Sequence, residues 1–221
     1  YTLIDTAGLR RKRGIKHGTS EGYSVVRTLR AIERCHVAVM LLDAEEGITE
    51  QDVRIIGLAV EKGRALVLVF NKWDAIEKDA KTADRVREQI ETKLPFARWA
   101  SVLYMSGLTG LRVHRLMGLV ADARESHLKR IPTAPLNRWL ELCVQRHQPP
   151  VVKNRRLRLY YATQARTAPP RIVVSCNDPT SVHFSYGRFL ENQFREAFKV
   201  HGTPIKLIFK GRKAQDDEEP I

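Results

Sequence analysis

The sequence predicts an α/β fold in two parts: a doubly wound, mostly parallel sheet followed by a small α+β domain. From residue 1 to about 125, short apolar runs alternate with segments of helical period, which is typical of parallel strands joined by crossover helices. After Pro132 and Pro135 the order becomes helix, strand, strand, helix, strand. Because 221 residues suffice for two modest domains, we expect domains at 1–129 and 130–213 and an acidic tail at 214–221.

Each element of the first domain follows from its own pattern. Strands are expected at four short apolar runs, Tyr1–Ile4, Val37–Asp43, Ala65–Asn71 and Ser101–Met105. Helices are expected where apolar residues recur every three or four positions, at 25–32, 53–60 and 82–94. A fourth helix is expected after Thr109, whose hydroxyl is a candidate cap. Ligands of such a sheet bind at the carboxyl ends of its strands.

The second domain has a different order of elements. A helix is expected from Leu136 to Val144, and alternation of polar and apolar residues predicts a strand from Arg156 to Tyr161. Further patterns predict a strand at Ile172–Cys176, a helix from Leu190 to Phe198 and a last strand from Ile205 to Phe209. The result is a compact α, β, β, α, β domain.

The net charge of +13 is concentrated in this second domain. Residues 130–213 hold 16 Lys and Arg against 4 Asp and Glu, whereas residues 1–129 hold 22 against 17. Contact with many phosphates needs such a density, because each neutralised phosphate releases condensed counterions. The distribution favours a nucleic-acid partner, and a merely solvated basic surface is the alternative.

The lengths of the apolar runs and the spacing of the cysteines exclude several classes of protein. The longest apolar runs have six residues, so no membrane span is expected. Cys35, Cys143 and Cys176 are far apart and form no CxxC pair, which argues against a disulfide framework and against a zinc site or other metal cluster. This cysteine usage favours the reducing cytoplasm. We also expect a monomeric protein.

Two motifs that follow predicted strands suggest nucleotide chemistry. In Asp5-Thr6-Ala7-Gly8, the Asp can reach Mg²⁺ through water and the Gly lets a backbone N–H approach a terminal phosphate. In Asn71-Lys72-Trp73-Asp74, the Asp74 carboxylate can accept from N1–H and N2 of guanine. Asn71 can bridge neighbouring loops or donate to the base, and the Lys72 stem can cover its face. An ordinary strand-end turn is the alternative.

A third motif, Ser106-Gly107-Leu108-Thr109-Gly110, follows the last predicted strand of the first domain. Backbone N–H groups in such a turn can face the guanine O6. The motif is weak by itself. All three motifs, however, lie at the carboxyl ends of strands of one predicted sheet, where doubly wound folds bind nucleotides.

The series DTAG, NKWD and SGLTG resembles the later guanine-nucleotide motifs of translation-factor-like GTPases. The surrounding sequence closely resembles the C-terminal half of the bacterial double GTPases of the Der (EngA) family, from residue 1 to about 210. The segments that carry this resemblance include YSVVRTLRAIE at 23–33, EGITEQD at 46–52 and LYYATQ at 159–164. The family pattern reads SALTG where this chain has SGLTG.

The resemblance implies two GTPase domains followed by a KH-like domain, acting in assembly of the large (50S) ribosomal subunit, with the ribosome and rRNA as partners. It implies GTP or GDP with Mg²⁺ as ligands, and a monovalent cation as a further candidate. The residues it assigns are Asp5, Thr6, Ala7, Gly8 and Leu9 for Mg²⁺ (through Asp5 and water) and the γ-phosphate, and Asn71, Lys72, Trp73, Asp74, Ser106, Gly107 and Leu108 for guanine. Leu9 stands where Ras-like GTPases place the water-orienting glutamine, so hydrolysis needs another element.

The phosphate-binding P-loop pattern, GxxxxGK[ST], occurs nowhere in these 221 residues. We therefore expect a fragment of a GTPase domain, with an unpaired gap in its sheet, that does not hydrolyse GTP by itself. The alternative is a non-catalytic RNA- or ribosome-binding module with remnant nucleotide motifs.

The predicted KH-like domain also lacks the GxxG loop that clamps RNA in other KH domains, because Gly187, Gly202 and Gly211 are not spaced three apart. RNA contacts are then expected through cations on the strands, with Arg155, Arg156 and Arg158 as candidates.

Overall fold

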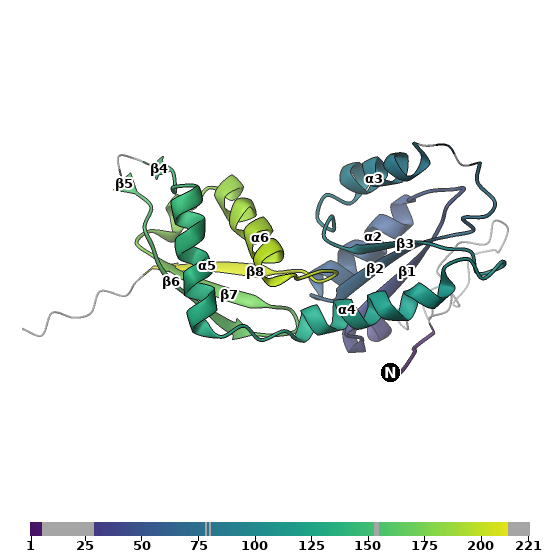
Figure 1. The fold of residues 1–221 in the computed structure, drawn as a ribbon, viewed down its shortest axis with the longest axis horizontal. Helices are drawn as coiled ribbons and strands as arrows, with labels where there is room; N and C mark the ends of the chain where they lie inside the picture. Colours follow the sequence, from purple (N-terminus) through teal and green to yellow (C-terminus); the bar gives the residue numbers. More distant parts are fainter. Residues whose placement is uncertain (6–28, 78, 80, 153–154, 212–221) are drawn as a thin grey trace, which may run out of the picture.

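The structure is a computed structural model that describes residues 1–5, 29–77, 79, 81–152 and 155–211. The described strands form two three-stranded sheets and one two-stranded ribbon. Figure 1 shows the two larger sheets in separate parts of an elongated molecule. We call residues 29–129 the N-terminal unit and residues 130–211 the C-terminal unit. The expected α/β fold in two parts is confirmed, and the exact domain bounds stay a prediction.

The sheet of the N-terminal unit consists of β1 (Val37–Asp43), β2 (Ala65–Asn71) and β3 (Ser101–Tyr104), all parallel and in that order. The strand β2 is apolar along its length and buried on both faces. Its alternate side chains pack against α2 (Glu50–Glu61) and α3 (Thr82–Lys93) on one side and against α4 (Leu116–Leu128) on the other. The sheet is therefore covered by helices on both faces, as the alternating pattern predicts.

Two local expectations for the first domain are wrong: the strand at its start and the helix cap at Thr109. Residues 1–5 form no strand, and the side chains of Tyr1 and Leu3 are 83% and 92% exposed. A strand forms only against a hydrogen-bonded neighbour, and β1 pairs with β2 alone among the described strands. The helix expected after Thr109 is α4, but Thr109 does not cap it: a short 3₁₀ turn at Val113–Arg115 comes first, and Gly110 and Arg112 take positive φ angles.

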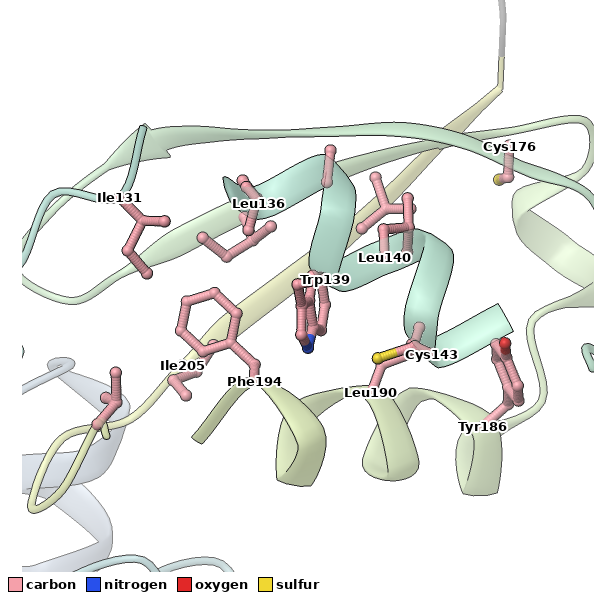
Figure 2. Packing of buried hydrophobic residues seen from close by; sticks show 14 of the residues in the cluster. Ile131, Leu136, Trp139, Leu140, Cys143, Cys176, Tyr186, Leu190, Phe194 and Ile205 are labelled. Carbon is pink, nitrogen blue, oxygen red and sulfur yellow. The ribbon is translucent and has the colours of Figure 1, made fainter. Parts of the chain in front are cut away.

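The C-terminal unit has the predicted element order. After α5 (Thr133–Arg146) and the short ribbon of β4 (Val151–Val152) and β5 (Arg155–Arg156) come β6 (Leu159–Arg166), β7 (Arg171–Cys176), the 3₁₀ turn Pro179–Ser181, α6 (Phe184–Phe198) and β8 (Lys206–Gly211). The strand β7 pairs antiparallel with β6 and parallel with β8. Figure 2 shows both helices on the same side of the sheet, with Trp139, Cys143, Leu190 and Phe194 between them and Leu140 directed toward the strands.

The two units meet at a joint built on Gly202. The Leu66 N–H donates to Gly202 O at 2.7 Å, and the Gly202 N–H donates to Trp99 O at 3.2 Å. The φ angle of Gly202 is +61°, and a Cβ there would lie 2.8 Å from the Ala123 Cβ and 2.9 Å from the Ser101 Oγ. Glycine is therefore required at this position by conformation and by space.

The joint continues through His127, at the end of α4. Its Nδ1 lies 2.8 Å from the Thr203 hydroxyl, and its carbonyl accepts from the Ala168 N–H at 2.9 Å. The side chain is fully buried, and its Nε2 has no hydrogen-bond partner among the described residues. Burial, followed by the positive charges of His36 and Arg64, lowers the pKa of His127 to about 4. The imidazole is therefore neutral at pH 7.

Candidate functional site

Three loops meet at the carboxyl edge of the N-terminal sheet. The register of the parallel strands places Asp43, the last residue of β1, beside Asn71, the last residue of β2. The loop after β3 is joined to the end of β2, because the Met105 N–H donates to Phe70 O and the Trp73 N–H donates to Met105 O, both at 3.0 Å. The second and third sequence motifs are thus brought together, as the parallel fold predicts.

Asn71 forms the side-chain link between these two motifs. Its Oδ1 accepts from the Gly107 N–H at 2.9 Å, across 36 residues of sequence. A Cβ at Gly107 would lie 3.5 Å from that same oxygen, which is ordinary van der Waals contact. The loop would therefore hold alanine as well as glycine, and the departure from SALTG leaves this contact intact.

Lys72 has a conformation that few non-glycine residues adopt, with a φ angle of 60°. Its Nζ lies 2.8 Å from Asp43 Oδ2, and the other oxygen of Asp43 accepts from the Glu45 N–H at 3.0 Å. Asp43 is 7% exposed, while the Lys72 side chain is 55% exposed. The buried carboxylate thus anchors the lysine, whose stem stays accessible.

Sequence reasoning gave no role to Asp43. The signal was present, because a carboxylate at the end of an apolar strand, directly after the buried Leu42, needs a partner. What could not be read from the sequence is that this partner is Lys72 of the neighbouring loop.

Trp73 is 6% exposed and packs on Tyr104, with ring centroids 4.3 Å apart. It belongs to the hydrophobic cluster of the N-terminal unit, and burial raises the pKa of Tyr104. Asp74, the next residue, is exposed to solvent. The buried indole therefore holds the loop against the core, while the carboxylate two positions after Lys72 faces outward.

In the loop after β3, most backbone N–H groups donate hydrogen bonds. The Ser106 N–H donates to Leu111 O, the Gly107 N–H to Asn71, and the Thr109 N–H to the buried Ser106 hydroxyl. The Thr109 hydroxyl accepts from the Leu111 N–H instead of capping a helix. The Leu108 N–H has no hydrogen-bond partner among the described residues, and its side chain is 90% exposed.

The remaining predicted site residues are less defined. Asp5 is exposed and makes no hydrogen bond or ion pair with any residue that the structure describes, and Thr6, Ala7, Gly8 and Leu9 lie outside the described residues. In the C-terminal unit, Arg155 and Arg156 form β5, and Arg156 and Arg158 are exposed. The Arg158 N–H donates to Asn177 Oδ1 at 2.8 Å.

Two absences hold for the part of the chain that the structure describes. It contains no cluster of three or more His, Cys, Asp or Glu side chains arranged to hold a metal ion. None of its helices is both long enough and apolar enough to cross a membrane.

Two family models match the chain. The Elongation factor Tu GTP binding domain matches residues 24–126, and the KH-domain-like model of EngA bacterial GTPase enzymes, C-terminal, matches residues 130–210. The first covers most of the N-terminal unit, including the loops after β1, β2 and β3, and the second covers the C-terminal unit.

Curated relatives agree with these models. GTPase Der of Clostridium perfringens is 47% identical over 213 residues, which are 96% of this chain and 48% of the relative. GTPase Der of Desulforamulus reducens is 46% identical over 216 residues, which are 98% of this chain and 49% of the relative. Among solved structures, one of Aquifex aeolicus Era covers 91% of this chain and 74% of its own at 14% identity, with a TM-score of 0.43.

The chain spans about half the length of the curated relatives that it matches. The match covers nearly the whole chain, and the two family models match its two units in order. The chain therefore belongs to the Der (EngA) family of GTPases.

Proposed function

We propose that the protein containing this chain binds guanine nucleotides and hydrolyses GTP during assembly of the large ribosomal subunit in the cytoplasm. The observation that carries the nucleotide part is the Asn71 carboxamide, which joins the loop of Asp74 to the loop of Leu108 through the Gly107 N–H. The relatives are named GTPase Der, which supports the hydrolytic part. The large subunit follows from the family resemblance alone.

The geometry supports a specific way to read guanine. The exposed Asp74 carboxylate would accept from guanine N1–H and N2, a pair that adenine does not offer. The Leu108 N–H would donate to O6, while the hydrogen bond between Asn71 and the Gly107 N–H holds its loop in place. The stem of Lys72, anchored by Asp43, would cover one face of the ring.

The phosphate side of the site rests on the family resemblance. Mg²⁺ would be held by Asp5 through water, with the backbone of Thr6, Ala7, Gly8 and Leu9 at the γ-phosphate. Bound Mg²⁺ would neutralise charge on the phosphates. Because this chain contains no P-loop pattern, we expect no GTP hydrolysis by the purified chain. A monovalent cation is a further candidate ligand of the phosphate loop.

The rRNA part of the proposal rests on charge. The C-terminal unit has a large excess of cations, and Arg156 and Arg158 are exposed on it. The monomeric protein would contact rRNA through this unit while the nucleotide bound at the neighbouring site changes from GTP to GDP.

The test uses the natural full-length gene product and a substitution that should change its base preference from guanine to xanthine. In Asp74→Asn, we expect the affinity of this site for GDP to fall about 100-fold or more, because two charge-assisted hydrogen bonds are lost, and its affinity for xanthosine diphosphate to rise. Glu77→Gln, which removes one exposed carboxylate of the same segment, is the matched control and should bind GDP like the wild type. Isothermal titration with both nucleotides gives the comparison.

Loss of GDP binding without a gain for the xanthine nucleotide would overturn the assignment of Asp74. Failure of the unmodified full-length protein to bind any guanine nucleotide would favour the alternative, a ribosome-binding module with remnant motifs.

A further inference from the structure

One face of the sheet in the C-terminal unit is not covered by the helices. The core of the unit contains Ala162, Ile172 and Val174, with α5 and α6 packed on that side. The opposite face, which we call the open face, is formed by nine residues that share a direction through the strand register: Tyr161, Thr163, Arg166, Arg171, Val173, Ser175, Lys206, Ile208 and Lys210. None of the nine belongs to the hydrophobic core of the unit.

A β-bulge turns an aromatic side chain toward this face. In β6, Leu159 pairs with Cys176 and Tyr161 pairs with Ser175, so Tyr160 is the extra residue. The bulge lets Leu159 stay against the core while Tyr161, 52% exposed, takes the open face. Without the extra residue, strict alternation would put Leu159 and Tyr161 on the same face. A tyrosine held outward on a rigid strand is a stacking surface.

A row of three cations crosses the other end of the face. Arg171 pairs with Arg166 on one side and with Lys206 on the other, so the three lie in one rung of the sheet. Neighbouring strands are about 4.8 Å apart, and like charges that face each other at this spacing repel. None of the three side chains makes an ion pair or hydrogen bond with a residue that the structure describes.

The composition of the strands sharpens this observation. The strands β6, β7 and β8 contain no Asp or Glu, and Lys210 adds a fourth cation in the rung of Tyr161. Exposed cations on ordinary strands are commonly offset by cross-strand carboxylates. A repulsive row without such carboxylates gains most from an anionic partner, so the charge points to phosphates.

We propose that the open face binds single-stranded RNA, with backbone phosphates on Arg166, Arg171 and Lys206 and a base stacked on Tyr161. The rung of Tyr161 lies four residues of β7 from the rung of Arg171, about 13 Å, which matches roughly two nucleotides of extended strand. The middle rung of Thr163, Val173 and Ile208 is nearly apolar and suits the flat face of a base. This inference rests on the proposed function and names its rRNA surface.

The face favours single strands over the other anionic partners. The bases of a duplex are paired and stacked on each other, and a duplex is recognised mostly by its shape and phosphates. Tyr161 would therefore make no stacking contact with a duplex. An acidic peptide would pair with the cations but would leave the aromatic and apolar rungs unused. The face also differs from the surface of Arg155, Arg156 and Arg158, which lies on β5 and the segment before β6.

The experiment measures binding of the 221-residue chain to a fluorescein-labelled eight-nucleotide RNA of mixed sequence by anisotropy, from 50 to 300 mM salt. The test variant is Arg171→Gln with Lys206→Gln. Its affinity at 100 mM salt should fall about tenfold, and the slope of log affinity against log salt should become shallower by about 1.4, since each phosphate contact of a single strand contributes about 0.7.

The matched control removes the same charge from the helical side of the same unit. Arg138→Gln with Arg188→Gln, on α5 and α6, should leave affinity and slope unchanged. Tyr161→Leu should lose fivefold or more in affinity with the salt slope unchanged, because stacking is not a phosphate contact. An eight-base-pair duplex RNA and polyglutamate of equal charge serve as competitors.

The outcomes separate the inference from the proposed function. Equal losses in the test and control variants, or competition by polyglutamate as strong as by RNA, would overturn the open face as an RNA site. If only the double variant Arg156→Gln with Arg158→Gln loses RNA binding, RNA binds at that other surface and not at the open face. The proposed function would not be affected by this result. GDP titration of the full-length protein with Arg171→Gln and Lys206→Gln should match the wild type, so a failure of nucleotide binding is recognised independently.

Discussion

The two ends of strand β2 are held in opposite ways. At its amino end, the Leu66 N–H donates to Gly202 of the C-terminal unit at 2.7 Å, and Ala123 and Ser101 crowd the glycine. At its carboxyl end, Asn71 holds the next loop through one side-chain hydrogen bond, beside exposed residues. The amino end is held by closely packed backbone, and the carboxyl end is held by a few polar side-chain hydrogen bonds.

This difference shows how one strand can both fix the two units relative to each other and support a loop that binds a ligand. Close backbone packing has few alternative arrangements, so the amino end fixes the two units relative to each other. Polar links between loops exchange partners at low cost, so the carboxyl end can rearrange around a ligand. Substitutions at the amino end should therefore act on stability, and substitutions at the carboxyl end on binding.

The largest effect is expected at Gly202. In Gly202→Ala, the positive φ angle costs about 1–2 kcal/mol and the crowded Cβ about 1–3 kcal/mol more, so the free energy of unfolding should fall by about 2–5 kcal/mol. Urea denaturation measures this. Gly187→Ala is the control: it lies in α6, where an added Cβ would meet no atom within 4 Å, and should be neutral or stabilising by up to about 1 kcal/mol. Equal effects at both glycines would refute a close-packed joint.

The joint should also weaken in mild acid through His127. Its pKa is about 4 in the folded chain and near 6.5 when unfolded, so the unfolded state binds the proton more readily. The stabilisation is complete above pH 6.5 and is lost as the pH falls from 6.5 toward 4. Between pH 7 and pH 5 the free energy of unfolding should drop by about 2 kcal/mol.

Acid also protonates carboxylates, so the measurement compares the wild type with His127→Gln at both pH values. The part of the pH dependence that comes from His127 should be missing in the variant. Identical pH dependence in the two proteins would mean that the imidazole is not held neutral by the joint.

The smallest effect on stability is expected at the carboxyl end. Asn71→Ala removes the hydrogen bond to Gly107, which should lower the free energy of unfolding by about 1 kcal/mol. In the full-length protein it should lower GDP affinity by tenfold or more, because the two loops lose their link. Asn137→Ala, which breaks hydrogen bonds between α5 and Ala162 in the C-terminal unit, should cost stability without changing GDP affinity. Unchanged GDP affinity in Asn71→Ala would contradict the role of the link.

The sequence predicted those elements whose pattern is local. The apolar runs Val37–Asp43 and Ala65–Asn71 form strands as expected, and α3 begins at the predicted Thr82. The meeting of the loops after β2 and β3 followed from parallel order alone, since carboxyl ends of parallel strands share an edge. The assignment of individual residues to guanine or phosphate stays a prediction.

Other features depend on contacts between distant residues. The apolar run at Tyr1–Ile4 reads as a strand, but hydrogen-bonded neighbours decide whether such a run pairs. The link between Leu66 and Gly202 spans more than half of the chain and leaves no periodic signal in either segment. The bulge at Tyr160 is also invisible to alternation, which predicted a regular strand from Arg156 to Tyr161.

The three thiols are distributed so that each unit carries its own chemical reporter. Cys143 and Cys176 are buried in the C-terminal unit, where burial raises the pKa of Cys143 to about 11 and also raises that of Cys176. Cys35, in the N-terminal unit, is only half-buried, and burial raises its pKa as well. Because Cys35 is the most accessible of the three thiols, alkylation should modify it first and reach the other two only when the C-terminal unit opens. Mass spectrometry of the labelled chain would therefore record the opening of each unit separately, without an engineered cysteine.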